Sequence, residues 1–215
     1  MNRTLVIETA TAACSVALIE GGRVIARAHE VVGRGHAERL IPMIAELPEG
    51  GCAARILVDV GPGSFTGVRV GIAAARGLAL GWGAEVSGLS SLALVAAAGL
   101  ACRPAPVLAA VLEGGHGEVF MQAFDASLEP LAPLASLTPA AAIAALAGMP
   151  AVGNGAGRLL ALDPALDAVD ALPNAADALL LPAALTTLPP PPLYGRAPDA
   201  KLPSAKVSGA GLPAA

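Results

Sequence analysis

Residues 61–71 read Gly-Pro-Gly-Ser-Phe-Thr-Gly-Val-Arg-Val-Gly, and this glycine-rich stretch decides the fold class. It follows an apolar run at 55–60 that has the length and composition of a buried strand. Ser64 or Thr66 can cap a helix, and the apolar residues that follow predict one as far as Gly81. A strand, a tight turn and a helix in this order are the unit from which layered α/β domains are built.

The turn fails the tests for three motifs that bind phosphate or carry a nucleophile. A P-loop and a dinucleotide fingerprint would each need a glycine at position 66, where this chain has threonine. A P-loop also needs a lysine, and the first lysine of the chain is Lys201. A nucleophile elbow around Ser64 would need glycines at positions 62 and 66. What remains is a turn that opens a helix, which either holds an anion through backbone amides or, as we favour, serves only as a turn.

Within the predicted helix, Gly67, Gly71 and Ala75 recur at a spacing of four residues, which puts them on one face. Glycine inside a helix costs about 1 kcal/mol relative to alanine, so two glycines on one stripe indicate that another backbone approaches closely. That backbone belongs either to the neighbouring sheet or to a helix of another chain, and composition does not separate the two.

The residues before the turn predict a meander of three short strands. Apolar runs at 5–7, 15–19 and 24–27 have the length of strands, and Gly21-Gly22 is a strong two-residue hairpin signal. A further strand is expected at 86–89, after the helix that the turn opens. Strands that first meander and then alternate with helices indicate an α/β layered domain.

A helix is expected between these strands, over residues 36–47, because Leu40, Ile44 and Leu47 fall on one helical face. Pro42 fits this helix only if it lies in the first turn, where a missing N–H costs little.

The second half of the chain predicts a smaller lobe. The proline-containing residues 103–106 mark a boundary, and strands are expected at 107–112 and 118–124. Thr138 and Asn174 are expected to cap helices. We therefore divide the chain into an N-terminal lobe at 1–104, a smaller C-terminal lobe at 105–190, and a proline-rich tail at 191–215 that partly returns to the first lobe and ends in disorder.

Composition and charge narrow the function classes. A net charge of -4 and a sequence pI of about 5.3 argue against gripping a nucleic-acid backbone alone, since that affinity comes from clustered Lys and Arg. Residues 86–102 and 130–157 carry no charge, and we interpret them as buried strands and helices rather than membrane spans. The three cysteines are widely scattered and predict neither a disulfide framework nor a metal site. A cytoplasmic protein without membrane contact is expected.

No catalytic residue, metal ligand or cofactor is predicted from the titratable side chains. The residue four positions after His36 is Leu40, so the predicted helix offers no metal pair. A phosphotransferase site in this kind of α/β domain needs a strand-end aspartate followed by a glycine-containing hairpin, whereas residues 8–11 here read Glu-Thr-Ala-Thr. The candidates for a degenerate nucleotide site are Glu8, Thr9, Thr11, Gly153 and Gly155.

Several segments resemble the bacterial TsaB (YeaZ) family. The most specific is 61–71, and residues 5–17, which read LVIETATAACSVA, resemble the start of that family. Residues 36–43 are similar to its first helix, residues 117–120 to a strand of its C-terminal lobe, and residues 194–201 to its closing motif. The resemblance spans nearly the whole chain.

The resemblance implies an actin-like (ASKHA, ribonuclease H-like) two-lobe α/β fold with mixed sheets flanked by helices. It also implies a non-catalytic subunit of the complex that adds a threonylcarbamoyl group to adenosine next to the anticodon of tRNAs reading A-starting codons. In such systems the catalytic paralogue TsaD binds the metal and transfers the group, and an ATPase, TsaE, joins the assembly. The subunit can pair with itself when it is alone, and tRNA is met only through the complex.

The helices at 36–47 and 66–81 are implied to form the pairing surface, which favours a partner helix as the contact of the small-residue stripe. We then expect Gly71→Leu to leave the chain folded and to abolish pairing. The interface residues implied in this way are His36, Leu40, Ile44, Gly67, Arg69, Gly71, Ala74, Ala75 and Leu78.

Three residues depart from the family pattern: Glu8 and Glu113 stand where Asp is usual, and Gly195 replaces an aliphatic residue, which is expected to loosen the tail. The two carboxylate changes count against a nucleotide role. Two other functions stay open. One is a divergent ATPase or phosphotransferase of the ASKHA fold, for which residues 9–11 and 153–157 argue. The other is a structural homodimer without a tRNA role that uses the same small-residue helix.

Overall fold

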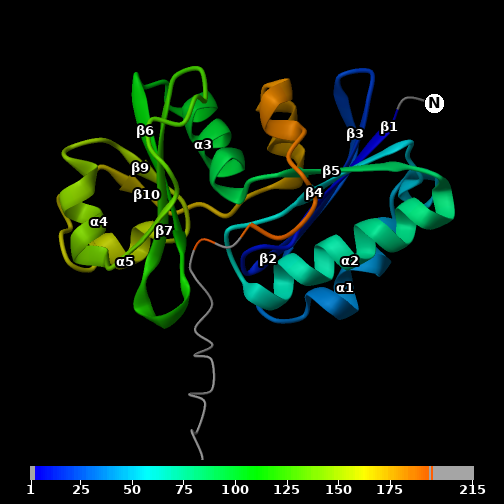
Figure 1. The fold of residues 1–215 in the computed structure, drawn as a ribbon, viewed down its shortest axis with the longest axis horizontal. Coiled ribbons are helices and arrows are strands. Elements are labelled where there is room, and N and C mark those ends of the chain that lie inside the picture. The colour runs from blue at the N-terminus through cyan, green and yellow to red at the C-terminus, as the bar shows by residue number, and fades with distance from the viewer. Residues whose placement is uncertain (1–2, 194, 196–215) are drawn as a thin grey trace, which may run out of the picture.

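A computed structural model describes residues 3–193 and 195. It contains two five-stranded sheets, each flanked by helices, that lie side by side (Figure 1). The strands of the first sheet run in the order β3-β2-β1-β4-β5, and those of the second in the order β10-β9-β6-β7-β8. The predicted α/β architecture of two lobes, each with a mixed sheet, is confirmed.

The first sheet is made of β1 (Arg3–Glu8), β2 (Ala13–Glu20), β3 (Arg23–Val31), β4 (Arg55–Asp59) and β5 (Glu85–Leu89). The second is made of β6 (Val107–Glu113), β7 (Val119–Asp125), β8 (Ala135–Leu137), β9 (Ala151–Val152) and β10 (Ala168–Val169). The α-helices are α1 (His36–Ala45), α2 (Phe65–Trp82), α3 (Ser91–Cys102), α4 (Pro139–Leu146) and α5 (Ala156–Leu160). The short 3-10 helices are η1 (Pro48–Gly51), η2 (Gly115–Gly117), η3 (Ala175–Leu180) and η4 (Ala183–Thr186).

The first sheet begins as the predicted meander and ends as a parallel unit. Gly21 and Gly22 join β2 to β3 with φ angles of 57° and 73°, the left-handed backbone that a two-residue hairpin requires. β4 then pairs in parallel with β1, with Ile7 opposite Val58, and β5 pairs in parallel with β4. Because the carboxyl ends of these three strands share one edge, the residues that follow them meet there.

Different helices cover the two faces of the first sheet. α1 and α2 lie below it in Figure 1 and pack on one face, where Ile7 and Val58 meet Leu40 and other apolar side chains. On the other face, Val6 shares a core with Leu92 of α3 and with residues of the second sheet. The two lobes are therefore joined through a continuous apolar core that contains α3.

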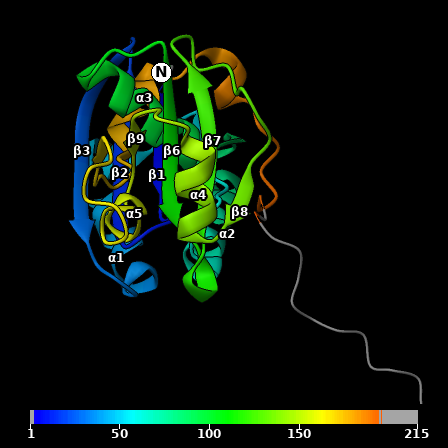
Figure 2. The same cartoon turned by 90° about the vertical axis from the view of Figure 1, so that its left-hand side faces the viewer.

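The second sheet is also covered on both faces. α4 and α5 lie in front of it in Figure 2, and their buried residues Ala142, Leu146 and Leu159 form a core with the sheet residues Val111 and Val119. α3 covers the other face. The uncharged stretches at 86–102 and 130–157 thus fold as packed strands and helices. In the described part of the chain, no helix combines the length and the hydropathy that crossing a membrane would take.

The helix α1 differs from our expectation at Pro42, which lies inside the helix and not in its first turn. Proline at this position removes the N–H that would bond to the carbonyl of Glu38, four residues earlier. Both residues are exposed, so water can satisfy that carbonyl. The exposed side of α1 therefore tolerates a residue that its buried side would not.

Both predicted caps are present. The Thr138 hydroxyl accepts a hydrogen bond of 3.3 Å from Ala141 N, and Asn174 Oδ1 accepts one of 3.0 Å from Ala176 N. The segment after Asn174 is a 3-10 helix, and Pro182 separates it from η4. The sequence did not predict β8, β10 or α5, because elements this short carry no clear periodicity.

The chain returns to the first sheet after the second one. η3 packs against β1, β2 and β3 as well as α3. Leu188 forms a bridge with Gly88 of β5, and Leu193 N donates a hydrogen bond of 2.7 Å to the Val60 carbonyl. Our lobe limits stay a proposal, and these contacts favour assigning residues 175–193 to the first lobe.

The end of the chain is described only in part. Residues 194 and 196–215, which include most of the expected closing motif and tail, lie outside the described residues. A β-carbon on Gly195 would lie 2.6 Å from two ring carbons of Phe120. The glycine therefore permits a close contact with β7 at a point where we expected a looser chain.

Candidate partner surface and interlobe cleft

The turn at 61–64 packs against the loop that follows β1. A β-carbon on Gly63 would overlap the Ala10 carbonyl oxygen, and Ser64 N donates a hydrogen bond of 2.7 Å to that same oxygen. The Ser64 hydroxyl accepts a hydrogen bond of 3.2 Å from Gly67 N and so caps α2 as predicted. The sequence of this turn is thus explained by backbone packing and helix capping, which supports the structural reading that we favoured.

The small-residue stripe of α2 faces the chain's own first lobe. A β-carbon on Gly67 would overlap the Thr9 carbonyl oxygen, and one on Gly71 would overlap the Thr9 hydroxyl oxygen. Ala75 is fully buried. Our expectation that this stripe contacts a helix of another chain is therefore wrong, because the backbone that approaches it is that of residue 9. A leucine at position 71 would overpack this contact, so Gly71→Leu does not test pairing.

Three residues of α1 that we assigned to the interface are also buried. His36 is 4% exposed, and its Nε2 lies 2.9 Å from the Ala13 carbonyl oxygen, within hydrogen-bonding distance. Leu40 and Ile44 belong to the core between α1 and the first sheet. These side chains hold α1 in place and are not available on the surface.

The remaining assigned residues lie at the boundary between core and surface. Ala74 and Leu78 are half-buried and pack against the edge of the core under α2. Arg69 is half-exposed, and its guanidinium carbon lies 3.2 Å from the centroid of the Phe65 ring, a cation–π contact. Of the nine predicted interface residues, these three reach towards solvent.

The opposite face of α2 is exposed, and large apolar residues stand at both of its ends. Phe65 is 68% and Leu80 89% exposed, with Ala73 and Arg76 between them at helical spacing. Ile41 of the neighbouring α1 is 48% exposed. We call Ile41, Phe65, Ala73, Arg76 and Leu80 the α2 surface. The sequence could have predicted the α2 surface, since large apolar residues lie on the helical face opposite the glycines. Our prediction of the interface was instead based on the glycine stripe.

A cleft of about 990 Å³ lies between the two lobes. One wall comes from the loops after β1, β3 and β4 and the start of α2, and the other from the η2 loop and Asn154. Glu113 on the second wall accepts a hydrogen bond of 2.9 Å from Arg158 Nε, and Glu118 accepts one of 2.6 Å from the Ser136 hydroxyl. The charged or titratable residues that line the cleft are Arg34, Arg69, Glu113, His116 and Glu118. A cleft with this lining can receive a polar ligand.

Of the five candidates for a degenerate nucleotide site, only Thr11 lines this cleft. Glu8 and Thr9 are fully buried, and the Thr9 hydroxyl donates a hydrogen bond of 2.8 Å to a carbonyl of α2. β-Carbons on Gly153 and Gly155 would collide with atoms of β6. These four residues have packing roles in the structure, and it does not bring them together with Thr11 around the cleft.

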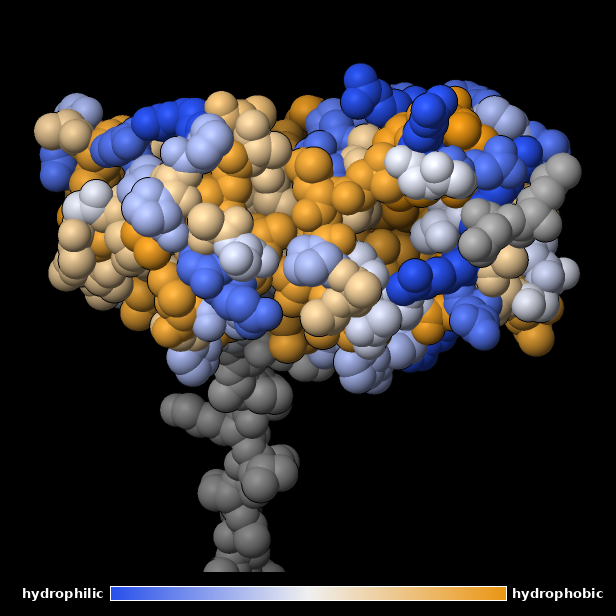
Figure 3. Space-filling model, turned by 90° about the horizontal axis from the view of Figure 1, so that it is seen from above, coloured by the Kyte–Doolittle hydropathy of each residue, from blue (hydrophilic) through white to orange (hydrophobic). Residues whose placement is uncertain are grey.

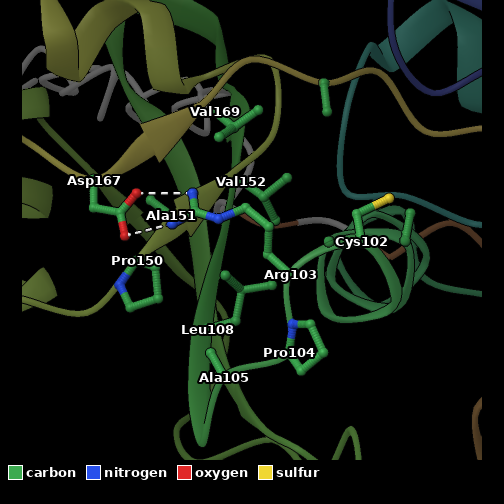
Figure 4. Close-up of a pocket in the computed structure, with 13 residues that line it drawn as sticks. Cys102, Arg103, Pro104, Ala105, Leu108, Pro150, Ala151, Val152, Asp167 and Val169 are labelled. Carbon is green, nitrogen blue, oxygen red and sulfur yellow. Dashed lines mark hydrogen bonds and ion pairs between the residues drawn. The ribbon is translucent and has the colours of Figure 1, made fainter.

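A smaller pocket of about 260 Å³ lies at the far end of α3, against the second sheet (Figure 4). Its lining is mostly apolar and includes Leu108 and Val152. Arg103 donates two hydrogen bonds of 2.8 and 2.9 Å to Asp167 at its edge, and this pairing lowers the pKa of the Asp167 carboxyl. The bidentate ion pair joins the end of α3 to the loop before β10.

Comparisons with known proteins support the resemblance seen in the sequence. The family model described as TsaD, tRNA N6-adenosine threonylcarbamoyltransferase, matches residues 27–157. The tRNA threonylcarbamoyladenosine biosynthesis protein TsaB of Escherichia coli K12 is 40% identical over 125 residues, which is 55% of this chain and 53% of that protein. A tRNA N6-adenosine threonylcarbamoyltransferase of Anaeromyxobacter dehalogenans is 32% identical over 146 residues, 56% of this chain and 43% of that protein.

Two solved structures cover more of the chain. A Pseudomonas aeruginosa protein described as similar to the peptidase YeaZ superposes with a TM-score of 0.75 at 30% identity, covering 91% of this chain and 100% of that one. A second structure, YeaZ from the same organism, superposes with a TM-score of 0.71 at 30% identity, covering 84% and 90%. The chain spans about half the length of the curated TsaB relatives that it matches.

These likenesses agree with the architecture. Two lobes of mixed sheet flanked by helices, with YeaZ structures as neighbours, confirm the actin-like (ASKHA) two-lobe fold that the resemblance implied. The family-model match includes α1, α2 and α3 and ends beyond β9, so it reaches both lobes. The chain therefore belongs to the TsaB (YeaZ) family, within the wider group of proteins that the TsaD family model describes.

Proposed function

We propose that this protein is a non-catalytic assembly subunit in the synthesis of threonylcarbamoyladenosine in tRNA. In this proposal it pairs through the α2 surface with the TsaD-type subunit that transfers the threonylcarbamoyl group, and a TsaE-type ATPase joins the pair. The names of its relatives support the pathway, since both biosynthesis proteins called TsaB and threonylcarbamoyltransferases match this chain. The site of action would be the cytoplasm, with tRNA met through the complex.

The observation that carries the pairing proposal is the exposure of large apolar side chains on α2 and α1. Leu80 is 89% and Phe65 68% exposed, although each would lose unfavourable contact with water if a partner covered it. Full burial of a leucine or phenylalanine side chain is worth about 1.5–3 kcal/mol. Exposed apolar side chains that share one face of a helix indicate an interaction site more often than ones scattered over separate elements do.

The match to the TsaD family model supports a paralogue as the partner. The family model matches residues 27–157, and this range includes both helices of the proposed surface, α1 and α2. A paralogue that shares the fold presents equivalent helices, and two such surfaces can pack around an approximate two-fold axis. Self-pairing through the same surface is then expected when the partner is absent.

The geometry of the loop after β1 supports placing the chemistry in the partner. Glu8 is fully buried and Thr9 donates its hydroxyl to α2, so neither side chain reaches a ligand in the cleft. Within residues 3–193 and 195, no group of three or more His, Cys, Asp or Glu side chains is placed to hold a metal ion. The packing roles of Glu8 and Thr9 favour a subunit that supports transfer over one that performs it.

Reconstitution tests this proposal. Threonylcarbamoyl transfer to tRNA is measured with purified TsaD-type and TsaE-type proteins, with and without this protein, and the modified nucleoside is counted by mass spectrometry of tRNA digests. We expect transfer only when this protein is present. Equal transfer in its absence would contradict the proposal. Turnover of ATP with magnesium by this protein alone would instead support the divergent phosphotransferase.

A further inference from the structure

Two carboxyl groups lie buried at the ends of the adjacent parallel strands β1 and β4. Glu8 is 0% exposed and Asp59 is 1% exposed. Because Ile7 lies opposite Val58, the next residues on the two strands, Glu8 and Asp59, are neighbours. Both side chains alternate with Ile7 and Val58, which face α1 and α2, so both point towards α3.

Each carboxyl group is hydrogen-bonded through only one of its oxygens. Glu8 Oε1 accepts a hydrogen bond of 2.7 Å from Ala10 N, and Asp59 Oδ1 accepts one of 2.6 Å from Gly61 N. The Ser91 hydroxyl lies 2.9 Å from Asp59 Oδ1 and can donate to it. Glu8 Oε2 and Asp59 Oδ2 are buried without a hydrogen-bond partner. A bare carboxylate oxygen away from water is costly, whereas a protonated one is far less so.

No opposite charge balances the pair. Among the described residues, neither carboxyl group forms an ion pair with Arg, Lys or His. Burial, and then the charge of Asp59, raises the pKa of Glu8 well above its usual value, although the backbone N–H groups of Ala10 and Thr11 act to lower it. Burial raises the pKa of Asp59 to about 7 against the lowering effect of Gly61 N–H and of Ser91. The groups that neighbouring elements place around the pair are Cys14 and Ser15 of β2, Leu89 of β5, Ser90 and Ser91 at the start of α3, and Asn174, which lies 3.4 Å from the Ser15 hydroxyl. Asp177 of η3 faces Arg27 and His29 of β3 instead.

We propose that Glu8 and Asp59 share one proton at neutral pH, and that this proton keeps the floor of the interlobe cleft closed. By floor we mean the part of the first-lobe wall that the loop at 10–12 and the turn at 63–64 form, since both line the cleft. Glu8 holds the first through Ala10 N, and Ser64 N joins the second to the Ala10 carbonyl. Asp59 holds the turn through Gly61 N, and α3 through Ser91.

Loss of the shared proton leaves two negative charges on neighbouring strands, at a site where water does not screen them. The charges repel each other and draw water, and the loops that they hold move apart. The cleft floor therefore opens as the pH rises above neutrality and closes as it falls. This device is independent of the proposed function, since it follows from the first lobe alone.

Nuclear magnetic resonance of the wild-type chain tests the shared proton without any substitution. The carboxyl carbons of Glu8 and Asp59 are followed from acid to alkaline pH. We expect one proton to leave near neutrality and a second at a clearly higher pH, with both carbons responding to both steps. Independent titration of both groups below pH 5 would overturn the proposal. A shift of these carbons on addition of millimolar MgCl2 at pH 7 would also overturn it, because a cation and not a proton would then bridge the pair.

Amide hydrogen exchange tests the opening of the cleft floor. After correction for the intrinsic effect of pH, protection of Ala10 N and Gly61 N in the wild type should fall above neutrality by at most about tenfold per pH unit, the limit for release of one proton. In Glu8→Gln, whose amide oxygen can still accept from Ala10 N, this fall should be lost. Glu85→Gln, an exposed change at the start of β5, should behave as the wild type. Constant protection in the wild type, or the same fall in Glu8→Gln, would overturn the proposed closure.

Discussion

Thr9 and Gly67 fasten the loop after β1 to the first turn of α2. The Thr9 hydroxyl donates a hydrogen bond of 2.8 Å to the Gly67 carbonyl oxygen, and a β-carbon on Gly67 would overlap the Thr9 carbonyl oxygen. The same hydroxyl oxygen fills the space above Gly71, one turn further along. One threonine therefore explains both glycines of the stripe, Gly67 and Gly71, and α2 is held to the sheet along this small-residue stripe.

The two faces of α2 should respond oppositely to an added methyl group. Gly71→Ala puts a β-carbon onto the Thr9 hydroxyl oxygen, and we expect it to lower the free energy of unfolding by about 1–3 kcal/mol. Gly77→Ala, on the exposed face with no atom within 4 Å of the new carbon, should raise it by about 0.5–1 kcal/mol. Urea denaturation of both variants checks this. A stabilising Gly71→Ala would show that the stripe does not pack as described.

Removing the Thr9 hydroxyl should weaken the same joint. Thr9→Val keeps the shape of the side chain but loses the buried hydrogen bond to the Gly67 carbonyl, so we expect a loss of about 1 kcal/mol of unfolding free energy. Thr66→Val, at an exposed position on the same helix, should change it by less than about 0.5 kcal/mol. Equal effects of the two variants in thermal or urea unfolding would contradict the role given to Thr9.

The helical stripe shows how far the sequence could be interpreted. Glycine spacing indicated correctly that a backbone approaches α2, because no other reason supports two glycines on one helical face. It did not identify which backbone, since Thr9 lies 58 residues before Gly67 and meets it only once β1 and β4 pair. The family resemblance then favoured a partner helix, and the structure shows that the contact lies within the chain.

The carboxyl pair could not be predicted from the sequence, for a similar reason. The sequence places Glu8 and Asp59 near the ends of two strands, but their spacing does not show that they meet, because their proximity depends on the parallel register of two strands with β2, β3 and α1 between them in the chain. Local patterns did predict the strands themselves, the hairpin at Gly21-Gly22 and the Ser64 cap. The pairing of strands that are distant in the chain leaves no local periodicity in the sequence. This pairing nevertheless determines which side chains meet at the site.

The buried pair also predicts how global stability depends on pH. The folded chain raises the pKa of Asp59 to about 7 and that of Glu8 well above its usual value, so it binds protons more tightly than the unfolded chain does. Each contribution to stability is therefore full below the unfolded pKa near 4. The contribution of Asp59 is lost as the pH rises through about 7, and that of Glu8 as the pH rises through its own raised pKa. The loss is at most about 1.4 kcal/mol per pH unit for each proton.

Glu8→Gln removes one of the two ionisations and should flatten this profile. We expect the variant to resemble the wild type at pH 4 and to be more stable than it above the pH at which the second proton leaves, because the wild type carries two buried charges only there. Glu85→Gln should follow the wild-type profile. Urea midpoints at several pH values measure the difference, and parallel profiles for the wild type and Glu8→Gln would rule out the coupling.

The α2 surface predicts a substitution that separates pairing from folding. Leu80→Arg changes a side chain that is 89% exposed, and a cation in the last turn of a helix is favourable. The free energy of unfolding should therefore change by less than about 0.5 kcal/mol. Pairing with a TsaD-type partner should nevertheless weaken at least tenfold, because an apolar contact is replaced by a charge that must lose water. Leu162→Arg supplies the control, since Leu162 is 60% exposed on the second lobe and away from α2. Binding is measured by calorimetry and stability by urea unfolding of the same samples. If Leu80→Arg binds like the wild type while Leu162→Arg binds weakly, the pairing surface lies on the second lobe and not on α2.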